Sequence, residues 1–279
     1  MTKVLITPRS FGKTDQIALS MLQSVGIEIV RNPTGSILTA GQMTELLADC
    51  DGVILGVDPL NEAVLAKAPR LQAVAKYGVG MDNIDLQACK ARGIRVSKTV
   101  GANAEAVADY AFALMLALAR QVLPIDTMCR QDNWNKLTTV DVYGRTLGLF
   151  GFGAIGRGVA RRAAGFDMTI LAYDVCWDEE YAAANHIIRA TLDEICRQAD
   201  FISLHLPLLP ETAHLIDARR LSLMKPSAIL VNTARGGLID ETALLQALSE
   251  KRLYGAGLDV FETEPPIDKS WYSLPNVIL

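Results

Sequence analysis

The chain has 279 residues, of which half are hydrophobic and 21% are charged, and its formal net charge is −4. This length allows roughly two domains, each with its own core, with a single barrel as the alternative. The slightly acidic balance argues against an extended basic face for nucleic acid, so a small molecule is the expected partner.

Short strand-forming runs alternate with helical stretches in the first third of the chain. The strand candidates are residues 4–7, 27–30, 53–55, 73–76 and 94–96, with helices expected between them at, for example, 14–24 and 62–67. This alternation is typical of parallel α/β layers. The N-terminus has neither the long apolar core nor the cleavage site of a signal peptide, so we expect a cytoplasmic protein.

A stretch rich in alanine and leucine, residues 104–118, follows these elements. Its composition predicts a packed helix that joins two domains. The most apolar part, residues 111–119, is followed by Arg120 and is much shorter than the ~20 residues that cross a bilayer. We therefore expect a buried helix and no membrane partner.

A second series of strands begins after this helix. Its candidates are residues 146–150, 168–173, 201–204, 229–232, 255–258 and 277–279. The fold class is thus α/β, with two Rossmann-like or flavodoxin-like parallel-sheet domains at 1–98 and 99–279. Five scattered cysteines predict free thiols rather than disulfides, and no metal site is expected.

The strand at 146–150 runs directly into Gly151-Phe152-Gly153-Ala154-Ile155-Gly156, which precedes a helical stretch at 157–164. This is the dinucleotide-binding arrangement: Gly151 permits the tight turn, Gly153 lets a pyrophosphate approach, and Gly156 lets helix and strand pack closely. The helix N-terminus would supply amide donors. Alone, such a triplet is weak evidence, because glycine-rich turns also join strands to helices without any ligand.

An acidic residue strengthens the cofactor interpretation. Asp174 ends the next strand, 18 residues beyond Gly156, where its carboxylate would accept hydrogen bonds from the adenosine ribose hydroxyls. The same charge would repel the extra phosphate of NADP, and residues 175–177 contain no arginine to receive one. NAD is therefore the predicted cofactor, which makes the second domain an NAD-binding Rossmann domain.

Together with the glycine loop, five further motifs resemble the D-2-hydroxyacid dehydrogenase family, and within it the phosphoglycerate dehydrogenases, over essentially the whole chain. They are Gly-Val-Gly-Met-Asp-Asn-Ile-Asp at 78–85, the segment 103–108, His-Leu-Pro-Leu at 205–208, the segment 232–237, and Leu-Asp-Val-Phe-Glu-Thr-Glu-Pro-Pro at 258–266. The resemblance implies hydride transfer between NAD(H) and a 2-hydroxy or 2-keto acid.

In this family a carboxylate-bearing substrate lies between the domains. The resemblance implies that the amides of Val79 and Gly80 hold it, together with Arg235, and it places Asn103 at the substrate site. Arg235 follows a strand end, where open α/β sheets bind ligands, and a guanidinium there can clamp a carboxylate and polarise its carbonyl. The alternative is a surface arginine paired with Asp240 or Glu241.

Two acidic residues carry further roles by resemblance. Glu264 matches the carboxylate that raises the pKa of the catalytic histidine, and a solvated loop carboxylate is the alternative. Asp259 matches the residue that binds the nicotinamide carboxamide, and a capping aspartate is the alternative. The remaining cofactor-binding residues contribute shape: Thr233, Ala234, Leu206 and Pro207 near the nicotinamide, and Ala154 and Ile155 over the pyrophosphate.

The catalytic histidine of the family follows a strand that resembles residues 276–279, in a Thr-Pro-His segment that this sequence does not reach. We therefore expect a truncated chain, with a first domain that lacks its C-terminal helix, and NAD binding with little or no turnover. Of His186, His205 and His214, only His205 lies at a strand end near the cofactor. There a backbone contact is favoured over replacement catalysis.

The substrate remains open between 3-phosphoglycerate and an unphosphorylated hydroxy acid, because Asp58 would repel a phosphate while Lys76 and Lys136 could compensate. A second hypothesis is an NAD-sensing binding protein of the dehydrogenase-like corepressor type, which the missing histidine would fit. The resemblance further implies a homodimer, with contacts from the helix at 104–118 and the segment through Trp134.

Overall fold

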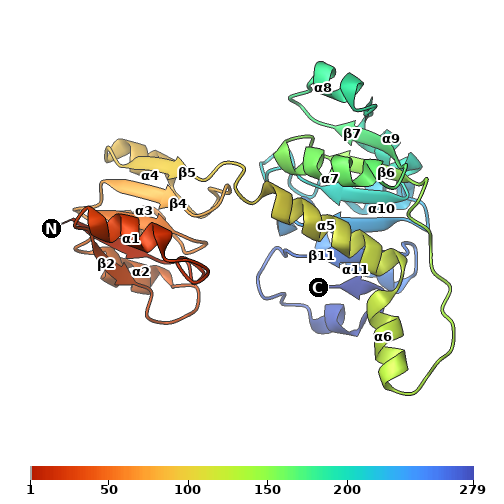
Figure 1. Cartoon of the computed structure of the whole chain (residues 1–279), viewed down its shortest axis with the longest axis horizontal. Coiled ribbons are helices and arrows are strands. Elements are labelled where there is room, and N and C mark those ends of the chain that lie inside the picture. Colours follow the sequence, from red (N-terminus) through yellow and green to blue (C-terminus); the bar gives the residue numbers. More distant parts are fainter. Residues whose placement is uncertain (1) are drawn as a thin grey trace. The chain divides into compact units, whose positions relative to one another are not determined.

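The computed structural model describes residues 2–279 and divides the chain into two compact units, one ending at Ala102 and the other beginning at Asn103. Figure 1 shows both units, each built around a sheet. The sequence placed the boundary after Lys98, the last residue of a strand. The structure adds residues 99–102 to the first unit.

The first unit holds a five-stranded sheet in which every pairing is parallel. Its strands are β1 (Lys3–Ile6), β2 (Glu28–Arg31), β3 (Gly52–Leu55), β4 (Ala73–Lys76) and β5 (Arg95–Lys98), in the order β2-β1-β3-β4-β5. This is the flavodoxin-like order, which confirms the predicted class.

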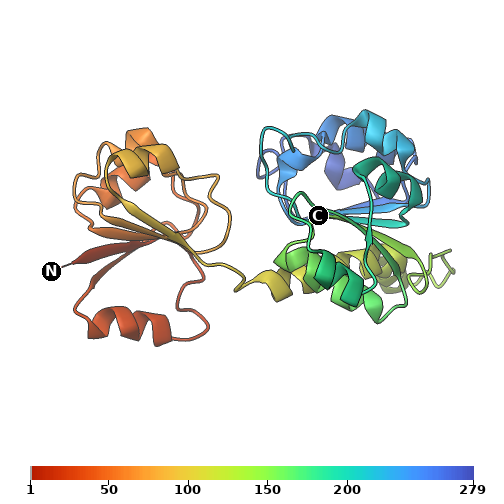
Figure 2. The same cartoon turned by 90° about the horizontal axis from the view of Figure 1, so that it is seen from above.

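Helices cover both faces of this sheet. Three of them, α2 (Ala40–Leu47), α3 (Glu62–Leu65) and α4 (Leu86–Ala91), pack with Leu5 and Val53 on one face. On the other face α1 (Ile17–Ser24) packs with Ile6 through Leu19. Adjacent strand residues such as Leu5 and Ile6 point to opposite faces of the sheet, so each face has its own layer of helices. Figure 2 shows these two layers.

The second unit holds a seven-stranded parallel sheet. Its strands are β6 (Thr146–Phe150), β7 (Thr169–Tyr173), β8 (Ile188–Arg189), β9 (Phe201–Leu204), β10 (Ile229–Asn232), β11 (Gly255–Leu258) and β12 (Val277–Ile278), in the order β12-β11-β10-β9-β6-β7-β8. The chain therefore leaves β6 in one direction and returns to β9 on its other side. This reversal is the position at which doubly wound sheets bind ligands, and it confirms the predicted Rossmann fold.

Two layers of helices cover the second sheet. One contains α5 (Ala104–Ala119), α7 (Ala154–Ala164) and α8 (Glu179–Ala184), and the other contains α9 (Leu192–Gln198), α10 (Ala218–Leu223) and α11 (Glu241–Ser249). Helix α6 (Val122–Arg130) follows α5 and buries none of its residues. Two short 3-10 turns lie at Gly236–Leu238 (η1) and Lys269–Ser273 (η2).

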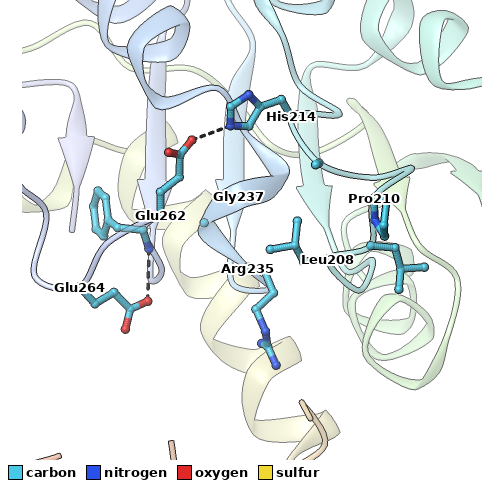
Figure 3. Close-up of a pocket in the computed structure, with 11 residues that line it drawn as sticks. Leu208, Pro210, His214, Arg235, Gly237, Glu262 and Glu264 are labelled. Carbon is cyan, nitrogen blue, oxygen red and sulfur yellow. Dashed lines mark hydrogen bonds and ion pairs between the residues drawn. The ribbon is translucent and has the colours of Figure 1, made fainter. Parts of the chain in front are cut away.

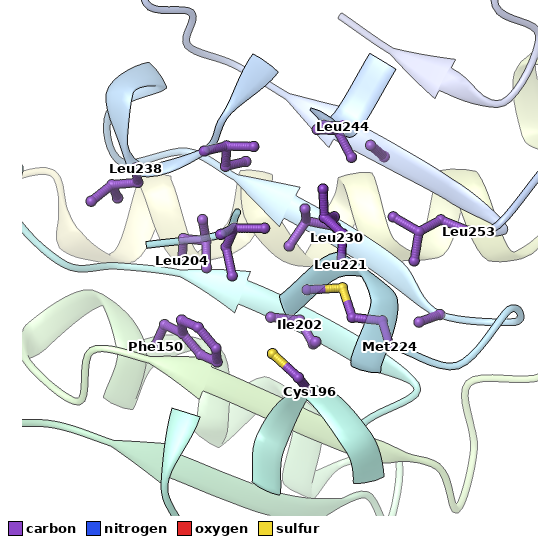
Figure 4. Packing of buried hydrophobic residues seen from close by; sticks show 14 of the residues in the cluster. Phe150, Cys196, Ile202, Leu204, Leu221, Met224, Leu230, Leu238, Leu244 and Leu253 are labelled. Carbon is purple, nitrogen blue, oxygen red and sulfur yellow. The ribbon is translucent and has the colours of Figure 1, made fainter. Parts of the chain in front are cut away.

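The core of the second unit follows from strict alternation along its strands. Phe150, Ile202 and Leu230 face the α9–α11 layer, while Leu149 on the same strand as Phe150 faces the α5–α7 layer. Figure 4 shows the first cluster, with Cys196 inserted between strands and helices. Because both faces of these central strands are buried, the residues at their ends are held on a rigid support.

The helix predicted at 104–118 is α5, and it belongs wholly to the second unit. Its apolar side chains, among them Ala111, Phe112 and Leu118, are buried, as expected for a core helix. The expectation that it joins the two domains was wrong, because the non-helical residues 99–103 make the connection. No single helix in residues 2–279 is long and apolar enough to span a membrane; α5 and α6 pass that test only as a pair bent by 57°.

Candidate active site

The carboxyl edge of the second sheet carries one row of residues across five neighbouring strands. The row is Asp174, Gly151, His205, Thr233 and Asp259, which directly follow β7, β6, β9, β10 and β11, and the last residues of these strands pair in register. The sequence had assigned four of the five to the cofactor, and the sheet now places them side by side across the switch point.

Backbone hydrogen bonds continue into this row beyond the strands themselves. The amide of Gly151 donates to the carbonyl of Tyr173 (2.8 Å), and the amide of His205 donates to that of Phe150 (2.6 Å). The amide of Asp259 likewise donates to the carbonyl of Asn232 (3.0 Å). The members of the row are therefore held by main-chain geometry and not only by their side chains.

Two glycines of the loop are required by the fold. Gly151 has a φ of +105°, and a Cβ there would lie 2.7 Å from the carbonyl carbon and oxygen of His205. A Cβ on Gly156 would lie 2.1 Å from the carbonyl oxygen of Gly151. Both positions therefore need glycine for the turn and for the close approach of helix α7 to the strand.

Gly153 differs from these two glycines, because a Cβ there would meet no atom within 4 Å. It is the N-cap residue of α7, and no side chain caps this helix, so amide groups of its first turn are open at the loop. A helix N-terminus with exposed amides and an open approach fits the pyrophosphate of a dinucleotide. Ala154 is also exposed and Ile155 half-buried at this opening.

Asp174 organises the loop from the neighbouring strand. Its carboxylate accepts hydrogen bonds from the amides of Phe152 (2.6 Å) and Cys176 (2.8 Å). The nearby Arg157 donates to Asp178 (2.9 Å) and to the carbonyl of Phe152 (3.1 Å). Asp174 thus supports the glycine loop from the position at which the ribose contact was predicted. The contact with the ribose itself stays a prediction.

Buried polar atoms without a partner lie in the middle of the row. Within residues 2–279, the hydroxyl of Thr233 and both ring nitrogens of His205 are buried and make no hydrogen bond. Burial lowers the pKa of His205 to about 3, so the ring is neutral at physiological pH. Such atoms are normally satisfied, and their place beside the glycine loop fits a bound group that would complete them.

The two predicted catalytic residues, Arg235 and Glu264, line one cavity of about 610 Å³ (Figure 3). Leu208 and Pro210 form its apolar wall, and His214 and Glu262 lie on the same lining. Leu206 is buried just before this wall, while Pro207 is exposed. The cavity therefore combines one guanidinium, one imidazole and two carboxylates with an apolar surface.

The turn that carries Arg235 is fixed by a buried side chain. Asn232 donates from its amide nitrogen to the carbonyl of Arg235 (2.8 Å) and accepts from the amide of Ala234 (3.0 Å). The two carboxylates considered as surface partners of Arg235 have other roles. Asp240 caps α11 through the amide of Ala243 (3.0 Å), and Glu241 accepts from the amide of Glu262 (2.5 Å).

The carboxylates of this region have distinct partners. Glu264 accepts from the amide of Phe261 at 3.3 Å, while Glu262 pairs with Nε2 of His214 at 2.8 Å. Burial and the neighbouring charge of Glu264 raise the pKa of Asp259, and burial also raises the pKa of Glu241. Sequence reasoning did not place His214 in the site, because its partner lies 48 residues away and no spacing signals such a contact.

In the first unit, Val79 and Gly80 lie in the loop that follows β4. Lys76, the buried last residue of β4, donates to the carbonyl of Gly56 (2.5 Å) and to the side chain of Asn83 (2.7 Å). These contacts hold the loop against the end of β3. Asn103 lies at the N-cap position of α5, is exposed and makes no capping bond with its side chain.

The role expected for Asp58 needs correction. Its carboxylate is buried and accepts hydrogen bonds from the amide of Leu38 (2.8 Å) and from the hydroxyl of Thr7. Its charge is therefore used inside the first unit, so its presence is a poor argument about a phosphate on the substrate.

The described residues offer no group of three or more histidine, cysteine or acidic side chains that could hold a metal ion. The groups that the site does offer are Arg235, the carboxylates, the histidines and the backbone amides of the glycine loop.

Comparison with known proteins agrees with this geometry. Residues 112–279 match the family described as D-isomer specific 2-hydroxyacid dehydrogenase, NAD binding domain. A glyoxylate reductase of Korarchaeum cryptofilum is 45% identical over 243 residues, which cover 84% of this chain and 73% of that protein. A D-3-phosphoglycerate dehydrogenase of Methanocaldococcus jannaschii is 38% identical over 283 residues, covering 100% of this chain but only 52% of the relative.

A solved structure adds a ligand-bound comparison. The D-lactate dehydrogenase of Aquifex aeolicus, complexed with NAD and lactic acid, has a TM-score of 0.84 and 31% sequence identity, and the match covers 99% of this chain and 86% of that one.

Proposed function

The chain belongs to the D-isomer-specific 2-hydroxyacid dehydrogenases, and from this premise we propose that it reduces a short, unphosphorylated 2-keto acid such as glyoxylate. It is an NAD-dependent oxidoreductase that acts on CH–OH groups, and NAD supplies or accepts the hydride when bound. The relatives give no support to the corepressor-type alternative.

One observation carries the substrate proposal: among the described residues that line the cavity, Arg235 is the sole permanent cation, and it shares the lining with Glu262 and Glu264. A single guanidinium can bind one carboxylate through two parallel hydrogen bonds. A substrate that carries a doubly charged phosphate in addition to its carboxylate would need further hydrogen-bond donors, and the two glutamates would repel the phosphate. The 45% identical relative is named as a reductase of glyoxylate, which has one carboxylate.

The residues of the second unit divide the work as follows. Arg235 orients the substrate carboxylate and polarises the adjacent carbonyl. Glu264 raises the pKa of the group that donates a proton to this carbonyl. The glycine loop and Asp174 hold the adenosine half of the cofactor, while Asp259 and the buried hydroxyl of Thr233 lie along the same row for its nicotinamide half. The amides of Val79 and Gly80, and Asn103, remain predicted substrate contacts.

The experiment measures the Kd of oxalate for the NADH-saturated protein and the competition of glyoxylate, hydroxypyruvate and phosphohydroxypyruvate with oxalate, so the preference can be measured even where turnover is slow. NADH oxidation with the same three acids is measured beside it. We expect the unphosphorylated acids to be preferred. Arg235→Lys should weaken oxalate binding at least tenfold without changing the Kd of NADH, since an ammonium cannot make the planar bidentate contact. A preference for the phosphorylated acid would contradict the proposed substrate.

A matched control is Arg252→Lys, because Arg252 is an arginine of the same unit that pairs with Glu250 (2.7 Å) in an exposed turn. This variant should bind oxalate as the parent does. Equal oxalate affinities for Arg235→Lys and Arg252→Lys would remove Arg235 from the substrate site.

We further propose that the protein is a cytoplasmic homodimer. Its binding partner is a small-molecule acid rather than a nucleic acid or a membrane. Exposed apolar side chains on and after α6, including Leu123 and Trp134, support a subunit contact there. All five cysteines are free, which suits a reducing compartment. Sedimentation equilibrium tests the dimer, and Leu123→Lys should shift it to monomer.

A further inference from the structure

We propose that His214 is a positioning residue that fixes the segment carrying Glu264 relative to the segment carrying Arg235. This inference rests on the proposed function, since it concerns the two residues assigned to the reaction. Figure 3 shows His214 and Glu262 pointing toward one another at the end of the cavity opposite the guanidinium of Arg235.

The first link runs through the backbone of His214. Its amide donates to the carbonyl of Gly237 (2.8 Å), in the 3-10 turn that follows Arg235. Two residues later, Ile216 forms a parallel bridge with Ile239. The backbone of His214 has a left-handed φ of 47°, which is uncommon outside glycine and turns the chain at this point.

The second link runs through the imidazole. Its Nε2 lies 2.8 Å from Oε1 of Glu262, two residues before Glu264. The amide of Glu262 is in turn held by Glu241, and Glu264 itself accepts from the amide of Phe261. The contact between Glu264 and Phe261 lies within the loop, so two side chains from other segments attach the loop that carries Glu264: His214 and Glu241.

The two linked segments are already in contact. A Cβ on Gly236 would lie 1.9 Å from the carbonyl carbon of Phe261, so the turn after Arg235 packs directly on the loop before Glu264. Residues 262–265 are exposed and form neither helix nor strand. Few contacts order such a loop, so removing one of these two side-chain attachments leaves Glu264 free to move against Arg235.

The test compares three single variants of the full chain. His214→Asn keeps the left-handed backbone accessible but carries its amide too close to the main chain to reach Glu262. His214→Gln extends an amide donor to about the place of Nε2 and should rescue the contact. His186→Asn is the matched control, because His186 is an exposed histidine with a φ of 56° that does not line the cavity.

Two readouts separate positioning from general stability. Hydrogen exchange should accelerate about tenfold for amides 261–264 in His214→Asn, with parent rates in the Gln variant and in His186→Asn. Oxalate affinity of the NADH complex should fall about tenfold in His214→Asn alone, while the Kd of NADH stays the same in all three variants.

Unchanged exchange of amides 261–264 in His214→Asn would overturn the inference, whether or not oxalate binds. Faster exchange with oxalate affinity equal to that of the parent would also overturn it, because the loop would then move without affecting the site. If the parent itself binds no oxalate, the proposed substrate site fails; accelerated exchange would then still show that His214 holds the loop.

Discussion

The carbonyl oxygen of Gly151 lies where a side chain on Gly156 would have to be, only 2.1 Å from the Cβ position. The partner atom is backbone, so it cannot move aside as the end of a flexible side chain would. Gly156→Ala should therefore lower the free energy of unfolding by about 2–3 kcal/mol, as overpacking does in a tight core. Urea unfolding measures the loss.

The control for that variant is Gly165→Ala at the other end of α7. Gly165 has helical backbone angles, and a Cβ there would lie 3.4 Å from the nearest atom outside its chain neighbours. Its substitution should change stability little. Equal losses for Gly156→Ala and Gly165→Ala would contradict the close approach of helix and strand.

Gly153→Ala should behave in the opposite way. No atom lies within 4 Å of a Cβ at this position, so the apoprotein should unfold as the parent does. The added methyl group would enter the open space at the N-cap of α7, where the pyrophosphate is expected. NADH affinity measured by fluorescence titration should fall about tenfold or more, and an unchanged Kd would place the pyrophosphate elsewhere.

Asp174→Ala should weaken NADH binding and reduce the preference for NADH over NADPH. The variant loses the carboxylate that holds the amides of Phe152 and Cys176 and that would repel the extra phosphate. Titrations with both cofactors should show a ratio of Kd values that moves toward one. Glu180→Ala, which removes an exposed carboxylate of α8, should keep the ratio of the parent.

The buried ring of His205 should make the apoprotein less stable in mild acid. Its pKa in the folded state is lowered to about 3 from the usual 6.5, so the unfolded chain takes up the proton first as pH falls. Stability therefore decreases below about pH 6.5, by at most about 1.4 kcal/mol per pH unit for this one proton.

His205→Gln should remove that component. Between pH 6 and pH 5 the free energy of unfolding of the parent should fall by about 1 kcal/mol more than that of the variant. The comparison cancels the other titrating groups, which both proteins share. Identical pH slopes would mean that His205 is protonated in the folded protein.

The sequence was most informative where a local run determines the structure. Strands β6, β9, β10 and β11 begin and end at the predicted residues, because each is a compact apolar run closed by a turn. The edge strand β8 was missed: it has two exposed residues, Ile188 and Arg189, and exists only through pairing with β7. Helix α1 begins at Ile17 rather than at residue 14, since the side chain of Asp15 accepts a hydrogen bond from the amide of Ile17 and turns the chain just before the helix.

The site divides in the same way. The roles of Gly151 as a turn residue and of Gly156 as a contact residue could be read from the loop itself, because the φ of Gly151 and the approach of Gly156 to its carbonyl oxygen are local. The close approach of Gly151 to His205 could not be read from the loop. The contact of His214 with Glu262 and the internal role of Asp58 could not, because each depends on segments brought together by the tertiary fold. Sequence spacing contains no signal for such pairs.

The row from Asp174 to Asp259 is assembled from five separate strands at one edge of the sheet, and its spacing is that of the strands themselves. Connections at the amino edge can therefore lengthen or shorten during evolution without disturbing the ligand-facing side. A deletion inside β10, in contrast, would withdraw Thr233 by about 3.3 Å while its neighbours stayed in place. Among related sequences, insertions and deletions should be frequent in the connections at the amino edge and rare within the strands.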